Sequence, residues 1–258
     1  MPRSTEANPA GCAGPSGDSL TAFFERLRDL CADHSTCHGQ GRDERIHAQT
    51  GQLLALAAEL GLLKKPQITW SDFLAARYED RIGSEHVVEL DPQSGLVAKT
   101  TQPPGFGLIP SLRKLPIVES LRSPTPNAFK QVIEFFPATP LEYLARWSAS
   151  NDVFGDDVQF VTVIQWQDGV VSMGITQPQY HGAPAEPREI EDYFKREGWS
   201  LLNDPSGHTV FYNYAFQIMA IDAEKRNCYI TEYGLQPFDV ILCVPDADME
   251  RFLKIYPE

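Results

Sequence analysis

The chain has 258 residues, of which 42% are hydrophobic, and a formal net charge of −13. That length is sufficient to bury one sizeable core or two small ones, which predicts a soluble globular protein. The negative charge argues against surfaces for nucleic acid or anionic membranes, because phosphate groups are bound by an excess of Lys and Arg. No apolar run approaches the roughly 18 to 20 residues of a membrane span, and no signal-peptide core follows Met1. We therefore expect a cytoplasmic protein whose partners include neither nucleic acid nor a membrane.

The first 68 residues are predicted to form an unstructured segment followed by two helices. Residues 1–18 are rich in Pro, Gly, Ser and Ala without periodicity, which is typical of a disordered lead-in. Apolar residues then recur at helical spacing twice, before Gly61 and Pro66 end the pattern. We expect residues 19–68 to form an N-terminal helical cap around Phe23, Phe24, Leu27, Leu30 and Cys31 in one helix and Leu53, Leu54, Leu56, Ala57, Leu60 and Leu62 in the other.

The segment between these helices contains Cys31, His34, Cys37 and His38. These residue types bind zinc, but structural zinc ligands usually come from two separate knuckles, and here all four crowd into one loop. We favour an ordinary polar loop over a zinc site. The five cysteines, an odd number at positions 12, 31, 37, 228 and 243, indicate reduced thiols instead of a disulfide framework.

From residue 70 onwards the pattern predicts short strands. Residues 85–90 and 96–99 are predicted to form two strands joined by a turn at 91–95. The second strand ends in Val97-Ala98-Lys99. A lysine in an apolar strand is either a solvated charge on an edge strand or a phosphate ligand whose charge a carboxylate neutralises. We favour the phosphate ligand because of acidic residues near the C-terminus. Residues 105–137 contain several prolines, which predicts an irregular insertion.

The middle of the chain alternates helices and paired strands. A helix is expected over residues 139–147, followed by a hairpin of 158–165 and 170–175 around Asp168-Gly169. Residues 177–182 leave that sheet, a helix over 189–197 ends at Gly198, and residues 210–221 return as paired strands. We interpret Asp156 and Asp157 as solvated or capping residues without a chemical role.

Near the C-terminus, residues 228–231 and 235–240 predict a β-hairpin around 232–234. Tyr233 lies midway between Asn227 and Asp239, so we expect these two residues to lie opposite each other at the open end of the hairpin. Asp222, on the preceding loop, completes an oxygen-rich corner that suits Mg²⁺ and substrate phosphates. Asp239 is flanked by apolar residues, so its charge must be paired or bound to a metal.

The order and spacing of Asp222, Asn227 and Asp239 are similar to those of the catalytic loop and metal-binding aspartate of protein kinases, and residues 97–99 look like the kinase strand that carries the phosphate-binding lysine. Further matching segments are residues 83–86, 139–144, 151–157 and 172–182. Together they resemble the serine/threonine/tyrosine kinase domain found in polyvalent proteins of phages and conjugative elements. The resemblance covers roughly residues 70–245.

This resemblance implies an α+β, protein-kinase-like two-lobe fold. Residues 69–176 would form the N-lobe and residues 177–258 a reduced C-lobe, with the helical cap as an N-terminal extension. ATP would be bound by Lys99, by Gly83 in the phosphate lid, and by backbone groups of a hinge that contains Gln177 and Gln179.

The resemblance also implies catalytic roles. Asn227 and Asp239 would hold Mg²⁺, and Asp222 would receive the proton of the phosphoryl acceptor. Glu142 would be the ion-pair partner of Lys99, with Glu134 as a substitute. Thr139-Pro140-Leu141-Glu142 is equally a capping box, in which the Glu142 carboxylate bonds the backbone at the helix start. Both interpretations of Glu142 stay open.

The chain also departs from the kinase pattern. It has no Gly-x-Gly-x-x-Gly loop, only Gly83-Ser84, and Ala220-Ile221 precede Asp222 where protein kinases usually have His-Arg. Only 19 residues follow Asp239, too few for a full activation segment and helical lobe. We therefore expect an ATP-dependent phosphotransferase whose unknown acceptor is more readily a protein than a small molecule. The alternative is a catalytically silent nucleotide-binding pseudokinase or a protein-interaction module of a mobile element.

Overall fold

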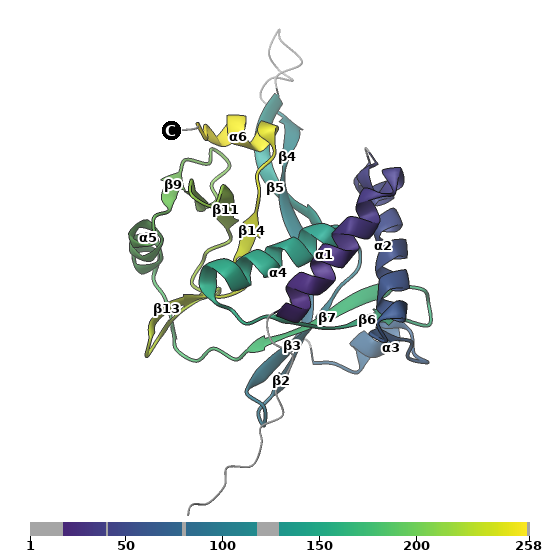
Figure 1. Ribbon diagram of the computed structural model, residues 1–258. Coiled ribbons are helices and arrows are strands. Elements are labelled where there is room, and N and C mark those ends of the chain that lie inside the picture. Colours follow the sequence, from purple (N-terminus) through teal and green to yellow (C-terminus); the bar gives the residue numbers. More distant parts are fainter. Residues whose placement is uncertain (1–17, 40, 79–80, 118–128, 257–258) are drawn as a thin grey trace, which may run out of the picture.

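A computed structural model describes residues 18–39, 41–78, 81–117 and 129–256 as a mixed α+β protein (Figure 1). The predicted disordered lead-in, apart from its last residue, lies outside the described residues. Within the described part of the chain, none of the helices combines the length and apolar character needed to cross a membrane.

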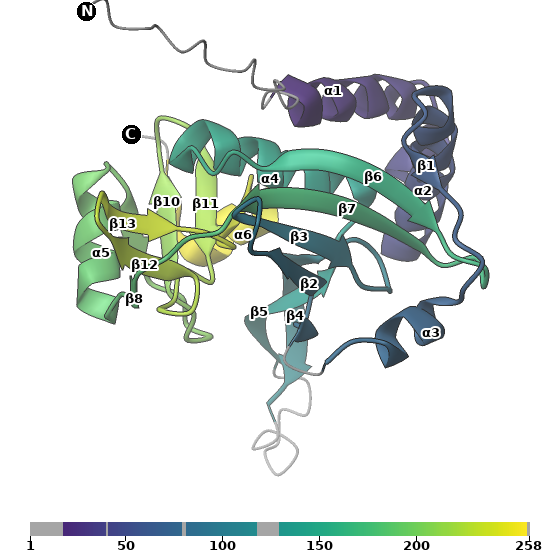
Figure 2. The same cartoon turned by 90° about the horizontal axis from the view of Figure 1, so that it is seen from below.

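The predicted pair of N-terminal helices is confirmed as α1 (Asp18–Ala32) and α2 (Arg42–Glu59), with a short 3₁₀ helix η1 (Ser35–His38) between them. Their apolar faces do not form a separate core. Leu20, Leu27 and Leu53 share one hydrophobic cluster with Trp147 and Ile175, which belong to a later helix and a later strand. The N-terminal helices are therefore part of the packing that supports the main sheet, as Figure 2 shows from below.

The main sheet has five strands in the order β1-β6-β7-β3-β2. All neighbouring pairs are antiparallel except β1 with β6. The two hairpins predicted around residues 91–95 and 168–169 are confirmed. The strands are β1 (Leu63–Lys64), β2 (His86–Asp91), β3 (Leu96–Thr101), β6 (Gln159–Gln165) and β7 (Val171–Pro178), and the short helix α3 (Trp70–Ala75) follows β1.

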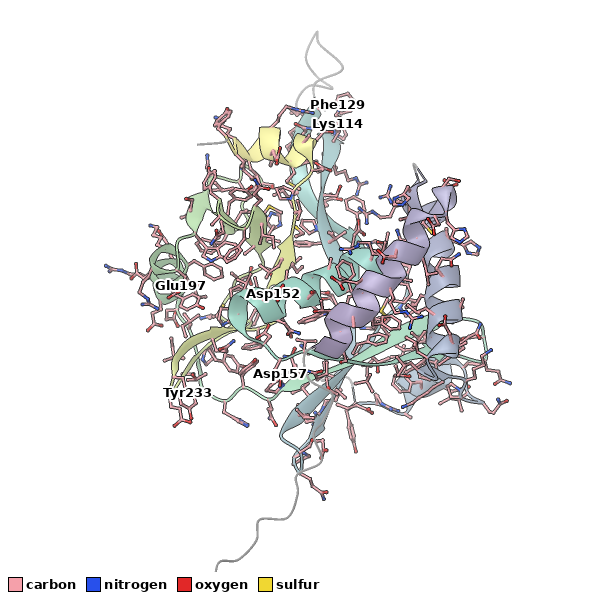
Figure 3. All side chains as sticks on the ribbon, viewed as in Figure 1. Lys114, Phe129, Asp152, Asp157, Glu197 and Tyr233 are labelled. Atoms are coloured by element: carbon pink, nitrogen blue, oxygen red, sulfur yellow. The ribbon has the colours of Figure 1, made fainter. Side chains whose placement is uncertain are left out.

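The prediction of an irregular insertion at residues 105–137 is wrong. β4 (Leu108–Pro116) and β5 (Phe129–Pro137) form a long antiparallel hairpin, and Figure 3 shows Lys114 and Phe129 together at its far end. Proline is tolerated here because each strand of a two-stranded ladder has one edge without a ladder partner. Ile133 of β5 packs into a cluster with the C-terminal strands.

The C-terminal part contains two small sheets, β14-β11-β10-β9 and β13-β12-β8. The helix predicted at 189–197 is observed as α5, and the paired strands predicted at 210–221 as β10 and β11. The elements are β8 (Ala183–Pro184), α5 (Pro187–Arg196), β9 (Ser200–Leu202), β10 (Val210–Asn213), β11 (Ile218–Ile221), β12 (Cys228–Thr231), β13 (Gly234–Pro237), β14 (Ile241–Cys243) and α6 (Ala247–Leu253).

Helix α4 (Pro140–Phe154) connects the two regions. Tyr143, Leu144 and Trp147 belong to the core beneath the main sheet, whereas Val153 and Phe154 pack against the core of α5 and the small sheets. The helix predicted over 139–147 is thus confirmed but is about two turns longer, and it ends at Gly155, whose φ of 66° is left-handed. Figure 1 shows α4 crossing between the main sheet and the C-terminal strands.

The β12–β13 hairpin is confirmed, but its register differs from the prediction by one residue. Thr231 pairs with Gly234 and Cys228 with Pro237, so the turn contains two residues. Gly234, with a φ of 114°, provides the positive dihedral that lets the strand resume after the turn. Asn227 consequently lies opposite Phe238, whose N–H donates to the Asn227 carbonyl at 2.8 Å, and not opposite Asp239.

Candidate functional site

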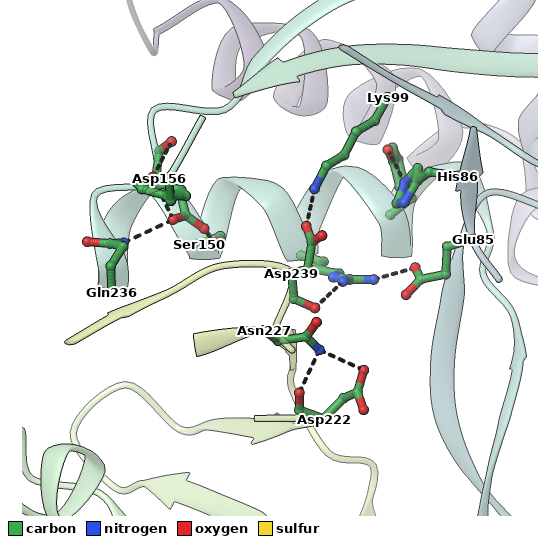
Figure 4. A network of polar contacts seen from close by, with 12 residues as sticks. Glu85, His86, Lys99, Ser150, Asp156, Asp222, Asn227, Gln236 and Asp239 are labelled. Carbon is green, nitrogen blue, oxygen red and sulfur yellow. Dashed lines mark hydrogen bonds and ion pairs between the residues drawn. The ribbon is translucent and has the colours of Figure 1, made fainter. Parts of the chain in front are cut away.

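The centre of the site is an ion pair between the buried Lys99 and the partly exposed Asp239 (Figure 4). Lys99 lies in β3, which is flanked on both sides by other strands, so the alternative of a solvated charge on an edge strand does not hold. Its side chain is only 3% exposed, and Nζ lies 5.2 Å from the centroid of the Trp147 ring. An opposite charge within contact distance is what allows an ammonium group to be buried this deeply.

Asp239 follows β13 with a left-handed φ of 57°, a conformation that turns its carboxylate out of the strand direction. Burial raises the pKa of Asp239, but the charge of Lys99 and the hydrogen bond from it, together with His86 and Arg146, outweigh burial and hold the pKa below its usual range. The carboxylate is therefore ionised at neutral pH. One third of this side chain is exposed, so a ligand can reach it.

Asp222 and Asn227 form a second pair beside it. Asn227 Nδ2 donates to the carbonyl of Asp222 at 2.8 Å and to its Oδ2 at 2.9 Å, while Arg226 donates to Oδ1 at 2.7 Å. Asp222 has a left-handed φ of 63°. These side-chain bonds of Asn227 use its nitrogen, which makes the amide oxygen the atom available to a cation.

A cavity of about 250 Å³ joins these residues. Asp222, Asn227, Asp239 and Gly83 all line it, so the structure brings together half of the site residues that the sequence singled out, and Lys99 adjoins the cavity through Asp239. Two carboxylates and an amide oxygen are donors that suit Mg²⁺, which is typically bound by one or two carboxylates, several waters and phosphate oxygens. No group of three His, Cys, Asp or Glu side chains is close enough to hold a metal within residues 18–39, 41–78, 81–117 and 129–256.

Sequence reasoning missed Arg146, the buried cation of this cavity. Its guanidinium, on α4, donates to Glu85 Oε2 at 2.5 Å and to the carbonyl of Asp239 at 2.8 Å, and its side chain is 4% exposed. Burial raises the pKa of Glu85, but Arg146 and further polar contacts hold it below the usual range. The signal was present in the sequence, since Arg146 lies between Tyr143 and Trp147 on the apolar stripe of a helix, where an arginine needs a partner.

Glu142 does not pair with Lys99. It accepts from the Thr139 backbone N–H at 2.7 Å while its own N–H donates to Thr139 Oγ1 at 3.2 Å, which is the capping box of the second interpretation. Its carboxylate also pairs with Arg42 at 2.9 Å. The substitute, Glu134, pairs with Arg113 at 2.7 Å. The partner of Lys99 is Asp239 instead.

The hinge and lid residues use their backbone within the sheet. Gln177 belongs to β7, opposite Val97, and the N–H of Gln179 donates to the carbonyl of Gly95 at 2.9 Å. Gly83 donates its N–H to the His86 carbonyl at 2.9 Å, so residues 83–85 form a tight turn before β2. The Gln177 side chain is 3% exposed, and its amide oxygen has no hydrogen-bond partner among the described residues.

His86 lies beside the ion pair. Its Nε2 and the hydroxyl of Tyr143 are 2.9 Å apart, and burial lowers the pKa of His86 to about 4. The ring is therefore neutral at physiological pH. The charges of the site come from the ion pairs of Lys99 with Asp239, of Arg146 with Glu85 and of Arg226 with Asp222.

The burial of individual side chains tests the predictions for Asp156 and Asp157 and for the loop with two Cys and two His residues. Asp156 is not solvated: it is fully buried and bonded by three side chains, whereas Asp157 is exposed. In the possible zinc loop, Cys31 and Cys37 are buried in the core while His34 and His38 are exposed. The cysteines and histidines of that loop therefore face different environments.

Comparisons with protein-family models, with curated proteins and with solved structures found no match to this chain.

Proposed function

We propose that this chain is a Mg²⁺-dependent nucleotide phosphotransferase of protein-kinase-like architecture, related to the kinase domain of polyvalent proteins. The observation that carries the proposal is that Asp222, Asn227 and Asp239 line one cavity and that Lys99 forms an ion pair with Asp239 beside it. These residues come from four separate positions in the sequence. The fold brings a cation suited to phosphate beside oxygen donors suited to Mg²⁺.

The order of elements supports a two-lobe arrangement. The lysine strand β3 lies inside an antiparallel sheet, helix α4 follows and packs against it, and β6 and β7 complete the sheet. Residues 179–182 then lead to the smaller sheets, where Asp222 and Asn227 precede a β-hairpin and Asp239 follows it. This is the succession of parts that a protein kinase uses to hold ATP.

The geometry suggests how these residues would act on ATP. As the phosphates enter, Lys99 would exchange the Asp239 carboxylate for phosphate oxygens, and Asp239 and the Asn227 amide oxygen would turn to the metal. Bound Mg²⁺ would neutralise charge on the phosphates. Asp222 would accept the proton of the acceptor hydroxyl as the new P–O bond forms and the bond between the γ-phosphorus and ADP breaks. Arg146 fixes the Asp239 carbonyl throughout.

One specific feature favours a second candidate, nucleotide binding without turnover. Both carboxylate oxygens of Asp222 are already bonded, to Arg226 and Asn227, and Lys99 has no carboxylate partner on α4. A base with both oxygens engaged must lose one bond before it accepts a proton. In this alternative the cavity binds Mg-nucleotide for a structural or signalling purpose.

We also infer a cytoplasmic location. The buried thiols of Cys31 and Cys37 are free although they are close enough to share a hydrogen bond. Neighbouring free thiols are typical of a reducing compartment.

The proposal is tested by ADP release and phosphoryl transfer from labelled Mg-ATP to protein and small-molecule acceptors. Asp239→Asn and Asp222→Asn are compared with Asp152→Asn, an exposed carboxylate on α4 outside the cavity. We expect turnover to fall by about 100-fold or more in the two cavity variants and to be unchanged in the control. Turnover that is indifferent to both cavity changes contradicts the phosphotransferase. Mg-ATP binding that depends on Asp239, without turnover, supports the second candidate.

A further inference from the structure

A second buried carboxylate, Asp156, lies close to the site but outside the proposed chemistry (Figure 4). Its Oδ2 accepts a short hydrogen bond from the hydroxyl of Ser150 on α4. Its Oδ1 accepts from the hydroxyl of Tyr180 at 3.1 Å and from the amide nitrogen of Gln236 at 3.2 Å. The three donors come from α4, from the linker between β7 and β8, and from β13. Asp156 therefore ties together three elements that are distant in sequence.

Tyr180 makes a second contact with the same region. Its ring stacks on Phe238, with centroids 5.7 Å apart and planes at 28°, and Phe238 also meets Tyr229 of β12 edge-on at 4.7 Å. Gln236 and Phe238 stand on either side of Pro237. The strand end is thus held twice, once through the Gln236 amide and once through the Phe238 ring.

Asp239 is the next residue after Phe238. Its left-handed backbone and its carbonyl bond to Arg146 fix it from the other side. The position of its carboxylate therefore depends on where residues 236–238 are held. Asp156 and Tyr180 hold them from the α4 side of the molecule, where the Gln236 amide nitrogen also donates to the carbonyl of Phe154 at 3.5 Å.

We infer that Asp156 is a positioning residue for Asp239: by binding Gln236 directly and Phe238 through Tyr180, it fixes the strand end that presents Asp239 to the cavity and couples that strand to the linker at 179–182. The effect on Mg-nucleotide binding rests on the proposed function. The effect on the conformation of residues 236–239 does not.

The chemistry of Asp156 fits this role. Its three hydrogen-bond partners are neutral, and none of the cations among the described residues touches it. Lys99 and Asp239 act on it from a distance with opposite signs, and Tyr193 and Asp157 are other titratable groups nearby. Burial raises the pKa of Asp156 to about 6. Its hydrogen bonds to Ser150, Tyr180 and Gln236 offset part of the cost of burying this carboxylate and fix the positions of the three donors.

The chain offers variants that separate geometry from charge. Asp156→Asn keeps all three contacts, because its oxygen can accept from Tyr180 and Gln236 while its nitrogen donates to Ser150. Asp156→Ala removes all three. Tyr180→Phe keeps the ring on Phe238 and removes only the hydroxyl. Asp157→Asn, at the exposed neighbouring position, is the matched control.

The experiment measures backbone amide hydrogen exchange of the full chain, together with Mg-ATP affinity by calorimetry. We expect exchange in residues 236–242 to accelerate about tenfold in Asp156→Ala and Tyr180→Phe, with strands β6 and β7 unchanged. The control should match the wild type, and the Asn variant should exchange no faster than the wild type at residues 236–242. Affinity for Mg-ATP should fall about tenfold in the same two variants and in neither of the others.

Exchange at 236–242 that is unchanged, or that rises equally across all strands, overturns the positioning role, because a purely structural residue would destabilise the whole fold. If the wild type binds no Mg-ATP while the exchange pattern is as expected, the proposed function fails and the positioning of Asp239 stands. If Mg-ATP binds the wild type and Asp156→Ala equally, the positioning role fails and the proposed function stands.

Discussion

Asp239, which is one-third exposed, and Asp156, which is fully buried, are two carboxylates near α4 with opposite electrostatic environments. Asp239 touches the ammonium group of Lys99 and lies near Arg146, and its pKa is held below the usual range. Asp156 is bound by a serine, a tyrosine and a glutamine, and burial raises its pKa to about 6. The comparison shows that neutral donors can fill the hydrogen-bonding positions of a buried carboxylate without compensating the desolvation of its charge. A contacting cation donates a hydrogen bond and also compensates that desolvation.

The largest effect on the free energy of unfolding is expected from removing the charge of Lys99. Lys99→Met leaves Asp239 without the contacting charge that compensates its desolvation, and breaking a buried pair in this way typically costs about 3 to 5 kcal/mol. Because the Asp239 side chain is one-third exposed, we expect about 2 to 4 kcal/mol of lost unfolding free energy. Urea denaturation measures it. The double variant Lys99→Met/Asp239→Asn should recover part of the loss, and a double variant no more stable than Lys99→Met would contradict the pairing.

Replacing Asp156 by asparagine is expected to have the opposite effect and to raise the free energy of unfolding. Its folded pKa of about 6 lies above the unfolded value of 3.8, so the wild type loses stability as the pH rises from about 4 to about 6, relative to a variant that cannot ionise. Asp156→Asn should therefore be more stable than the wild type by up to about 3 kcal/mol at pH 8 and equal to it near pH 3.5. Urea unfolding across this pH range tests it. A difference that does not change with pH would show that the pKa of Asp156 is the same in the folded and unfolded protein, and so that burial does not raise it.

The smallest of the three effects concerns Glu142 and its helix cap. Thr139→Ala removes the side-chain half of the capping box and should cost about 1 kcal/mol of stability, without altering Mg-ATP affinity. If Mg-ATP affinity falls together with stability, Glu142 and the start of α4 contribute to nucleotide binding, which would contradict a purely capping role. Thermal unfolding with and without Mg-ATP distinguishes the two results.

The sequence predicted the local elements better than their pairing. Hairpins at 85–101 and 158–178 follow from turn residues and alternating strands, and α5 follows from its periodicity. The register of the β12–β13 hairpin was missed by one residue because a turn of two residues and one of three are both compatible with Glu232-Tyr233-Gly234. The β4–β5 hairpin was missed because its prolines argue against regular strands. In a two-stranded ladder each strand has one edge without a partner, where proline is tolerated.

The candidate site likewise contains residues that the sequence predicted and residues that it did not. The convergence of Lys99, Asp222, Asn227 and Asp239 on one site was expected from their spacing and from the kinase resemblance, but Lys99 was expected to pair with Glu142 and pairs with Asp239 instead. Arg146 and Asp156 were not expected in the site. The place of Arg146 on the apolar stripe of α4 indicated that it needs a partner, but its partner Glu85, like Tyr180 and Gln236 for Asp156, comes from a distant segment. Buried polar networks of this kind depend on tertiary contacts that periodicity does not encode.

The measurement that tests the central claim most directly is Mg-ATP affinity by titration calorimetry for the wild type, Asp239→Asn and Asp152→Asn. A site in which Lys99, Asn227 and Asp239 hold a Mg-nucleotide predicts that the wild type and the Asp152 control bind equally and that Asp239→Asn binds at least tenfold more weakly in Mg²⁺. Equal affinity in all three proteins, or no binding by any of them, would contradict it.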